Sequence, residues 1–385
     1  MKLAFQLAYR NLMGAGLRTW LNVGVLAFSF IIIIFFRGLL EGWQRQSINE
    51  SIEWEYGFGH LLHEEYDPYD PFTILDSHGT LDDESSQSLT PILVRQASIY
   101  PDGRMLSVAL KGIGTDQDIL KLPTEEIGNT KASIPAIIGK GMSNAAGLNE
   151  GDEVLLRWRD KGGTFDAASI SIVKVFSTNV ATVDNGQVWI PINKLWEMTG
   201  LEGHATFYVA NENFKTDSPE GWKFRDQDAL LKDFYDLMEM EKISTAFMYL
   251  LLLSIALLAI FDTQVLSVFR RQKEIGTYVA LGMTRSQVVA LFTVEGSMYS
   301  LFAMIVGCIV GFPLFWFLTT NGISFPDFYR EMGITFPTTL FPVFSIEVII
   351  TTILLVVISA TIVSFLPARK ISRMNPVLAL KGKLQ

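Results

Sequence analysis

Four long apolar segments limit this chain to folds that cross a membrane. They cover residues 21–40, 246–266, 288–318 and 346–366. A helix needs roughly 20 predominantly apolar residues to cross the hydrocarbon core of a bilayer. Each segment is long enough, and the third exceeds a single crossing, so we expect it to tilt or to emerge from the bilayer. The sequence therefore predicts four transmembrane helices, with boundaries at 20–42 (first span and stalk), 244–268, 288–318 and 346–366.

The first apolar segment differs from a cleaved signal peptide. Its basic leader is long, Arg37 interrupts its end, and no Ala-x-Ala cleavage pattern follows. We therefore expect an uncleaved anchor.

The distribution of basic residues predicts the orientation of the spans. Basic residues precede the first span, lie between the second and third spans, and follow the fourth: Lys2, Arg10, Arg18, Arg270, Arg271, Lys273, Arg285, Arg369, Lys370, Arg373, Lys381 and Lys383. The short loop at 319–345 carries only Arg330, beside Asp327 and Glu331. Because loops rich in Lys and Arg stay in the cytoplasm, both termini and the loop at 269–287 are predicted to be cytoplasmic.

Residues 43–243 then form a large extracytoplasmic domain. The chain is 49% hydrophobic but still 18% charged, which suits a mixture of membrane spans and a hydrated domain. Short strand-like runs are expected at 107–111, 136–138, 153–158, 169–176 and 188–190. Helices are expected at 140–146, ended by Gly147, and at 192–198, capped by Asn193 and ended by Gly200. An acidic, Ser-rich stretch at 76–90 is expected to be a mobile loop. The predicted fold is therefore a membrane helical protein with an α+β extracytoplasmic domain between helices 1 and 2.

The residues give little support for an enzyme, a metal site or nucleic-acid binding. His60 and His63 would share a face on a helix, as zinc ligands do, but their neighbours suit a strand, which would separate them. No Gly-x-Ser-x-Gly motif, Cys/His pairing or basic-aromatic cluster is present, and Cys308 is the single cysteine. We predict no catalytic residues, no metal and no nucleic-acid partner.

Two charged residues fall in or near the predicted spans. Arg37 lies near the outer end of the first, and Asp262 near the inner end of the second. Charges inside a membrane often mark functional sites, but both side chains could also extend to the nearby interface.

The cytoplasmic loop at 269–287 predicts a separate short helix. It would begin near Gln272 and end at Gly282 in the left-handed conformation, before a Thr284-x-x-Gln287 capping box opens the third span. By spacing alone, this helix could also be an amphipathic turn lying at the membrane surface.

Four regions of the sequence resemble the FtsX/MacB-like permease family of type VII ABC transporters. The loop resembles the family's Arg-x-x-Glu-Ile-Gly-x-x-x-Ala-Leu-Gly-x-x-x-x-Gln coupling segment, with Arg271 as its first residue and Gln287 as its last. The amino end resembles the family's membrane-parallel helix, which implies a cytoplasmic helix at 1–19. Residues 367–380, within the predicted tail at 367–385, resemble its Pro-Ala-Arg carboxyl end. The extracytoplasmic domain is similar to the LolC/LolE branch at three places: Gly59-His60-Leu61, residues 138–152 and residues 184–186. Within the second, residues 141–143 differ from the sequence pattern of that branch.

This resemblance implies a dimer of permease subunits bound to a cytoplasmic ABC ATPase dimer. No Gly-x-x-x-x-Gly-Lys-Ser/Thr motif is present, so ATP and Mg would be bound by the ATPase and this chain would hold no cofactor. The ATPase-coupling residues implied are Glu274, Ile275, Gly276, Ala280, Leu281, Gly282 and Arg285. Ile275 and Leu281 would be apolar contacts, and Glu274 and Arg285 polar ones.

The same branch implies a lipoprotein cargo, taken from the inner membrane and passed to a periplasmic acceptor. The residues expected to face this cargo or the membrane lipid are Ile33, Phe36, Leu40, Met248 and Leu252. They suit lipid-facing or dimer-packing positions equally well. Two alternatives stay open: MacB-like mechanotransmission for periplasmic peptide or drug efflux, and an FtsX-like regulator of a cell-wall hydrolase that transports nothing.

Overall fold

The chain folds into a helical unit and a sheet unit. The computed structural model describes residues 16–82, 88–214, 218–325 and 339–373, except for the side chains of Arg18, Ser372 and Arg373. The helical unit is built from described residues within Met1–Trp43, Met238–Ile323 and Leu340–Gln385. The sheet unit is built from those within Gln44–Leu237 and Ser324–Thr339. The predicted amino-terminal helix lies mostly outside the described residues.

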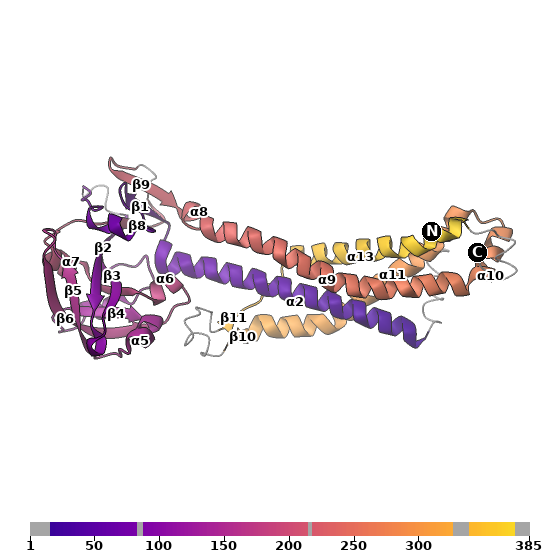
Figure 1. Ribbon diagram of the computed structural model, residues 1–385, viewed down its shortest axis with the longest axis horizontal. Coiled ribbons are helices and arrows are strands. Elements are labelled where there is room, and N and C mark those ends of the chain that lie inside the picture. Colours follow the sequence, from indigo (N-terminus) through magenta and orange to yellow (C-terminus); the bar gives the residue numbers. More distant parts are fainter. Residues whose placement is uncertain (1–15, 83–87, 215–217, 326–338, 374–385) are drawn as a thin grey trace. The chain divides into compact units, whose positions relative to one another are not determined.

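Four helices of the described chain are long and apolar enough to cross a membrane. They are α2 (Leu17–Ser51), α9 (Lys232–Arg270), α11 (Arg285–Asn321) and α13 (Ile346–Arg369). The predicted number of spans is therefore confirmed (Figure 1). Both α2 and α9 continue beyond their apolar segments, as the predicted stalks require. The orientation of the termini stays a prediction.

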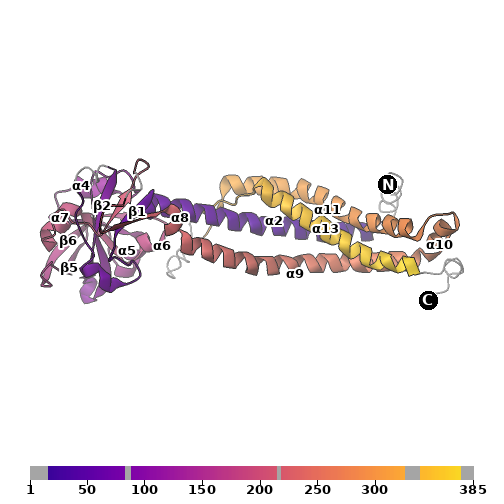
Figure 2. The ribbon, with the colours of Figure 1, turned by 90° about the horizontal axis from the view of Figure 1, so that it is seen from above.

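The helical unit packs most closely where α11 meets α13, which lie side by side in both ribbon views (Figures 1 and 2). Gly296 makes this approach possible, because a Cβ at this position would overlap the Ser364 side chain and lie 2.8 Å from Nε2 of Gln264. Small residues commonly occupy such contacts between membrane helices. A cluster of buried apolar side chains, including Leu26, Phe30 and Ile260, completes the interior.

The sheet unit contains nine strands that pair in the order β3-β7-β4-β6-β5-β2-β8-β1-β9. Their bounds are β1 Gly59–His63, β2 Leu89–Ile99, β3 Leu106–Ile113, β4 Pro135–Gly139, β5 Glu153–Arg159, β6 Phe165–Phe176, β7 Gln187–Pro191, β8 Phe207–Ala210 and β9 Trp222–Asp226. A further two-stranded sheet joins β10 (Ile323–Ser324) to β11 (Thr339–Leu340).

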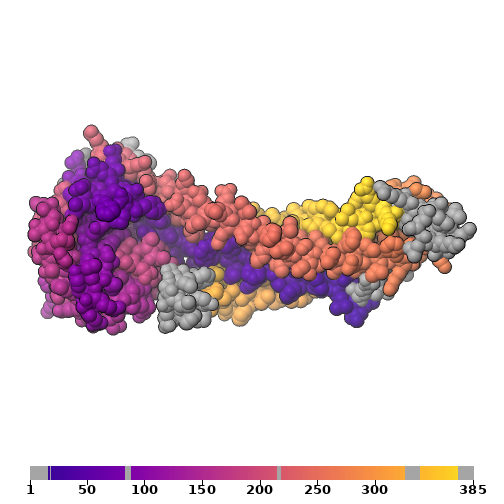
Figure 3. All heavy atoms as spheres, viewed as in Figure 1, coloured from indigo at the N-terminus to yellow at the C-terminus, as the bar shows by residue number. Residues whose placement is uncertain are grey.

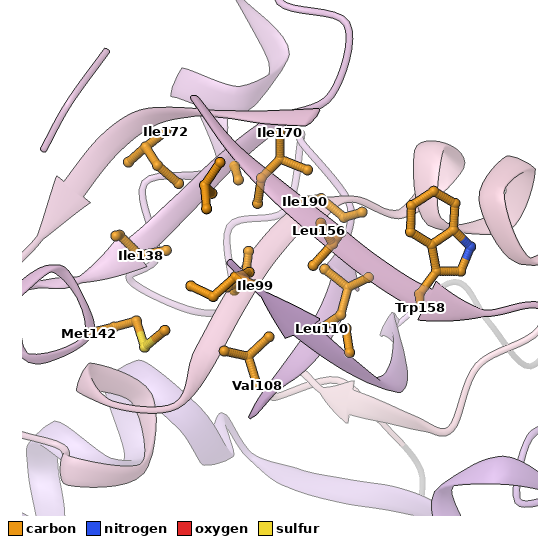
Figure 4. Close-up of a cluster of buried hydrophobic side chains, with 14 of the residues drawn as sticks. Ile99, Val108, Leu110, Ile138, Met142, Leu156, Trp158, Ile170, Ile172 and Ile190 are labelled. Carbon is orange, nitrogen blue, oxygen red and sulfur yellow. The ribbon is translucent and has the colours of Figure 1, made fainter. Parts of the chain in front are cut away.

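Six strands of the larger sheet close into a barrel, because β2 pairs with both β5 and β3. Alternate residues of β5 point inward, where Leu156 and Trp158 are buried. Figure 4 shows Leu156 among Ile99, Leu110, Ile170 and Ile190 inside the closed sheet. The first half of β2 leaves the barrel and pairs with β8, which continues through β1 to β9.

Short helices connect the strands of the sheet unit. They are α4 (Thr124–Gly128), α5 (Lys140–Ala146), α6 (Ala181–Asp184), α7 (Ile192–Thr199) and α8 (Gln227–Leu230), with 3₁₀ turns at Pro71–Leu75 and Pro101–Gly103 and a π-helical turn at Ile52–Tyr56. The predicted ends of α5 and α7 are confirmed, since Gly147 and Gly200 adopt φ of 71° and 68°. The predicted Asn193 cap is wrong. The helix begins at Ile192, as predicted, so Asn193 is its second residue, and Pro191 is in the capping position with no side-chain bond.

The α+β prediction for this domain is confirmed, and all five predicted strands are present within β3 to β7. Strands β2, β8 and β9 were not predicted from the sequence. Pro91, Arg95 and Gln96 interrupt the alternation that would have indicated β2. The predicted mobile loop is also wrong around residues 77–79. Ser77 is buried there, and Gly79 exchanges backbone hydrogen bonds with Ala205.

Candidate functional site

A short helix between the second and third membrane helices forms the candidate coupling site. This helix, α10 (Gln272–Ala280), is bounded as predicted. Gly282 follows it with φ of 98°, and the Met283 N–H donates to the Tyr278 carbonyl, which closes the helix end. The Thr284 hydroxyl then accepts from the Gln287 N–H, while the Gln287 side chain accepts from the Thr284 N–H. This capping box starts α11 and fixes the direction in which the chain leaves α10.

Arg271 joins α10 to α11. Its Nη1 donates to both carboxylate oxygens of Glu295 at 2.9 and 2.8 Å, and its Nε donates to Oε2 of Glu274 at 2.7 Å. The guanidinium also lies 4.8 Å from the centre of the Phe292 ring. Only 17% of the Arg271 side chain is exposed. Burial by itself lowers the pKa of Arg271, but the Glu295 and Glu274 carboxylates outweigh it and hold that pKa above its ordinary value.

Glu295 was not predicted as a site residue, although the sequence carries a signal for it. Glu295 is the one acid in the apolar run at 288–318. An ionisable residue in such a segment requires a partner, and Arg271 supplies it. The guanidinium bonds Glu274 through Nε and Glu295 through Nη1, so a single charged group links the start of α10 to α11.

The inner face of α10 packs against the membrane helices. Ile275 lies in a buried cluster with Val268, Val288, Phe292 and Ala368. Ile275 is only 2% exposed, so its implied role as an apolar contact for a partner is corrected: it anchors α10 within the chain. Gly276 is buried as well.

The remaining residues of the implied coupling set lie on the surface of the chain. The Leu281 side chain is 79% exposed. The other exposed members are Glu274, Ala280, Gly282 and Arg285. The structure thus separates the predicted set into an inward-facing pair and an outward-facing group around Leu281.

Polar side chains continue from the coupling site into the interior of the helical unit. Nδ2 of Asn22 on α2 donates to the Thr263 hydroxyl on α9 at 2.5 Å. Gln264 and Ser364 are buried beside Gly296. Further along, Nη1 of Arg37 donates to the hydroxyls of Thr351 and Thr352 on α13 at 2.8 and 3.0 Å. Arg37 therefore connects two membrane helices.

Asp262, the other charged residue singled out by sequence, is exposed on α9. Neither interpretation of it is tested.

The predicted cargo-facing residues do not form one surface. Ile33 is buried within the helical unit, so its assignment to a cargo-facing surface is corrected. Phe36 and Met248 are exposed, and Leu40 and Leu252 are half-buried. Figure 3 shows α9 uncovered along the visible face of this unit. The exposed apolar residues of α9 include Leu250, Ile255 and Leu258.

The histidine pair of the sheet unit lies on a strand, as its neighbours indicated. His60 is buried, and its Nε2 lies 2.9 Å from the Glu55 carbonyl oxygen. His63 packs against Trp222 instead. In the part of the chain that the structure describes, no three or more His, Cys, Asp or Glu side chains are grouped in a way that could hold a metal ion.

Comparison with known proteins identifies the class. Residues 246–376, which span α10 and three membrane helices, match the model of the FtsX-like permease C-terminal family. The chain is 21% identical over 385 aligned positions to the lipoprotein-releasing system transmembrane protein LolC of Haemophilus influenzae, covering 93% of this chain and 91% of that protein. It is also similar to the extracellular domain of the noncanonic ABC-type transporter YknZ from Gram-positive bacteria. That similarity covers 40% of this chain and 83% of the domain, at 15% identity and a TM-score of 0.26.

Four membrane helices, a helix pair linked by α10 and an extracytoplasmic domain define a multi-pass inner-membrane permease of the ABC type. Residues 246–376 of this chain are therefore similar to the carboxyl-terminal part of FtsX-like permeases.

Proposed function

We propose that this permease couples ATP hydrolysis in a separate cytoplasmic ATPase dimer to the extraction and release of lipoproteins from the inner membrane. The observation that carries the proposal is the similarity to LolC, which extends over both the membrane helices and the extracytoplasmic domain. A second permease subunit would complete the assembly, and ATP and Mg would be bound by the ATPase. A periplasmic acceptor would receive the cargo.

The two faces of α10 support a role in transmission. Its inner face is fixed to α11 and α13 through Ile275 and the Arg271–Glu295 ion pair. At its outer end Leu281 is exposed, and so are Glu274 and Arg285. An apolar side chain flanked by charged ones suits a surface that docks on another protein. A force applied to this end would reach the membrane helices without passing through a flexible segment.

The exposed apolar face of α9 supports a lipid-linked cargo. The apolar side chains on this face are between 49% and 67% exposed: Phe247, Leu250, Leu251, Ile255 and Leu258. Such side chains offer an acyl chain the same environment as the bilayer, so lateral movement of a lipid anchor along them has little cost. A polar solute would find no comparable surface there.

Replacement of Leu281 tests the coupling role. We expect Leu281→Asp to reduce ATPase association at least about tenfold, because it places a charge in an apolar contact. Leu281→Met is the matched control, since it keeps the apolar surface. Both variants should insert and fold as the unchanged chain does, because the side chain makes no buried contact. If the Leu281→Asp variant binds the ATPase and stimulates its activity as the unchanged chain does, Leu281 is not part of the interface.

A reconstituted release assay tests the cargo. The chain, its second subunit and the ATPase are placed in proteoliposomes with a tri-acylated lipoprotein and, separately, with the same protein lacking its acyl chains. We expect ATP-dependent release of the acylated form alone. Copurification separates the alternatives: a bound periplasmic adaptor would favour efflux, and a bound cell-wall hydrolase would favour the regulatory role.

A further inference from the structure

A groove on the barrel of the sheet unit has the size of a small-molecule site. It encloses about 410 Å³ and is lined by β2, β3, β5, the start of β6 and the 3₁₀ turn at Pro71–Leu75. Ligand sites usually occupy roughly 300–1,000 Å³. All of the lining residues belong to the sheet unit and lie within the described chain.

The residues that line the groove include basic side chains but no acidic ones, and Asp76 and Asp160 act on Arg95 from outside the lining. The basic side chains are Arg95, Arg157 and Arg159. The nearest turn contains Asp160, but its Oδ1 accepts the backbone N–H groups of Gly162 and Thr164. An anion entering the groove would therefore meet three guanidinium groups and no carboxylate in the wall.

Two of these arginines are held in place by an aromatic ring. Arg157 and Arg159 project from the outward face of β5, and Phe165 lies directly opposite Arg159 on β6. The two guanidinium carbons are 3.9 and 4.4 Å from the centre of the Phe165 ring. Stacking of this kind uses the flat face of a guanidinium and leaves its N–H donors in the plane free for an anion.

The donors of Arg157 and Arg159 are in fact unused within the described chain, where neither side chain has a hydrogen bond or an ion pair. Arg95 has a different role. It is buried, and its Nη1 donates to the carbonyls of Ile74 and Leu75 at 3.2 and 2.9 Å. It thereby fixes the 3₁₀ turn that forms one wall of the groove.

The rim of the groove is apolar. Phe72 on the 3₁₀ turn is 89% exposed, and Met105 before β3 is 64% exposed. Large apolar side chains this exposed, grouped around one opening, commonly mark a binding surface. Phe165, itself half exposed, connects this apolar rim to the two arginines.

We propose that this groove binds a small amphipathic anion: a carboxylate, sulfonate or phosphate attached to an apolar or aromatic body. Arg157 and Arg159 hold the anionic group, and Phe72, Met105 and Phe165 cover the apolar body. Neither half of the site is sufficient, because an exposed arginine pair alone is well hydrated and the apolar rim alone is too open. The site is independent of the coupling role of α10 and of the cargo.

Calorimetric titration of the full chain in a neutral maltoside detergent tests this assignment, with empty micelles subtracted. The probe is 2-naphthalenesulfonate, and the two comparison ligands are sodium sulfate, which lacks the apolar body, and 2-naphthalenemethanol, which lacks the charge. We expect saturable 1:1 binding of the probe and at least tenfold weaker binding of the other two. Equal binding of sulfate, or equal binding of the neutral alcohol, would overturn the amphipathic site.

Variants locate the site. The double variant Arg157→Gln and Arg159→Gln should bind the probe at least about tenfold more weakly, since two charge-assisted contacts are lost. The charge-matched control, Lys131→Gln with Lys140→Gln, changes two exposed lysines that lie outside the lining and should bind normally. Equal affinity of the two double variants would exclude the groove. The unfolding temperature of each variant verifies that the barrel is intact.

A competition arm separates two sources of the anion. Phosphatidylglycerol added to the micelles should displace the probe if the natural ligand is a lipid headgroup. Displacement by a short-chain aryl phosphate, without displacement by the lipid, would indicate a soluble ligand. Failure of both to displace the probe would overturn the assignment to an anion of this class.

Discussion

Both units of this protein have an apolar interior, but the helical unit leaves far more large apolar side chains exposed. The barrel interior is filled by branched and aromatic apolar side chains such as Ile99, Leu156 and Ile170. The helical unit also has an apolar cluster, but several of its most buried positions are polar or small, among them Gln264, Glu295 and Ser364. Many of its large apolar side chains, among them Trp316 and Phe312, are exposed.

This difference follows from the solvent of each unit. In water, apolar burial of about 25 cal/mol per Å² drives the barrel together. Lipid tails are as apolar as leucine, so that drive is absent between membrane helices, and close packing and interhelical polar contacts replace it. Gly296 against Ser364, and Arg271 against Glu295, are the two contacts of this kind nearest to α10.

The largest expected effect concerns the ion pair. Glu295→Leu should destabilise the helical unit by about 3–5 kcal/mol, because it leaves Arg271 buried without its main partner. Thermal unfolding in detergent measures the change. The double variant Arg271→Met with Glu295→Leu should recover much of this loss. In the sheet unit the exposed Lys174–Glu150 pair offers the contrast: Glu150→Gln should cost at most about 1 kcal/mol. Equal costs for the two pairs would contradict the comparison.

Truncation of leucine should distinguish the units next. Leu156→Ala in the barrel is expected to cost about 2–5 kcal/mol, because Leu156 is fully buried and the cavity cannot collapse. Leu258→Ala removes the same atoms from an exposed position on α9, where lipid or detergent fills the space, and should cost less than about 1 kcal/mol. Unfolding monitored separately for the two units provides the measurement. A large effect at Leu258 would mean that another subunit covers this face.

Lowering the pH should destabilise the sheet unit. Of the three predictions, this one has the smallest expected change in stability. All four histidines of the chain lie between residues 60 and 204. Burial lowers the pKa of His60 from 6.5 to about 4. Below about pH 6.5 the unfolded chain binds a proton at this histidine, whereas the folded domain binds it only near pH 4. The free energy of unfolding therefore decreases as the pH is lowered from about 6.5 to about 4.

The expected slope from His60 is at most about 1.4 kcal/mol per pH unit in this window. His60→Gln keeps a donor for the Glu55 carbonyl but does not titrate. Denaturant unfolding at pH 7 and pH 5, followed by the fluorescence of Trp158 and Trp189, should show a smaller acid loss in this variant. An unchanged acid loss would assign the pH dependence to other groups.

The sequence by itself determined the features that depend on residues close together in the chain. Runs of roughly 20 apolar residues gave the four spans. The ends of α5, α7 and α10 could be predicted because Gly147, Gly200 and Gly282 adopt positive φ at modest cost. The capping box at Thr284 and Gln287 is likewise local, since both partners lie within one turn. The Asn193 cap failed because α7 already begins at Ile192, so Asn193 lies within the first turn and Pro191 occupies the capping position.

Only the tertiary structure decided which of these local features meet. Ile275 and Leu281 read alike as apolar residues of one short helix, yet one is buried against Val288 and Ala368 and the other faces outward. The pairing of Arg271 with Glu295 and the closure of the barrel through β2 join segments that no local pattern connects. Such contacts depend on strand register and helix packing, which are set jointly by many distant side chains. For that reason the sequence predicted the helix at α10, and the structure alone showed which of its faces is free.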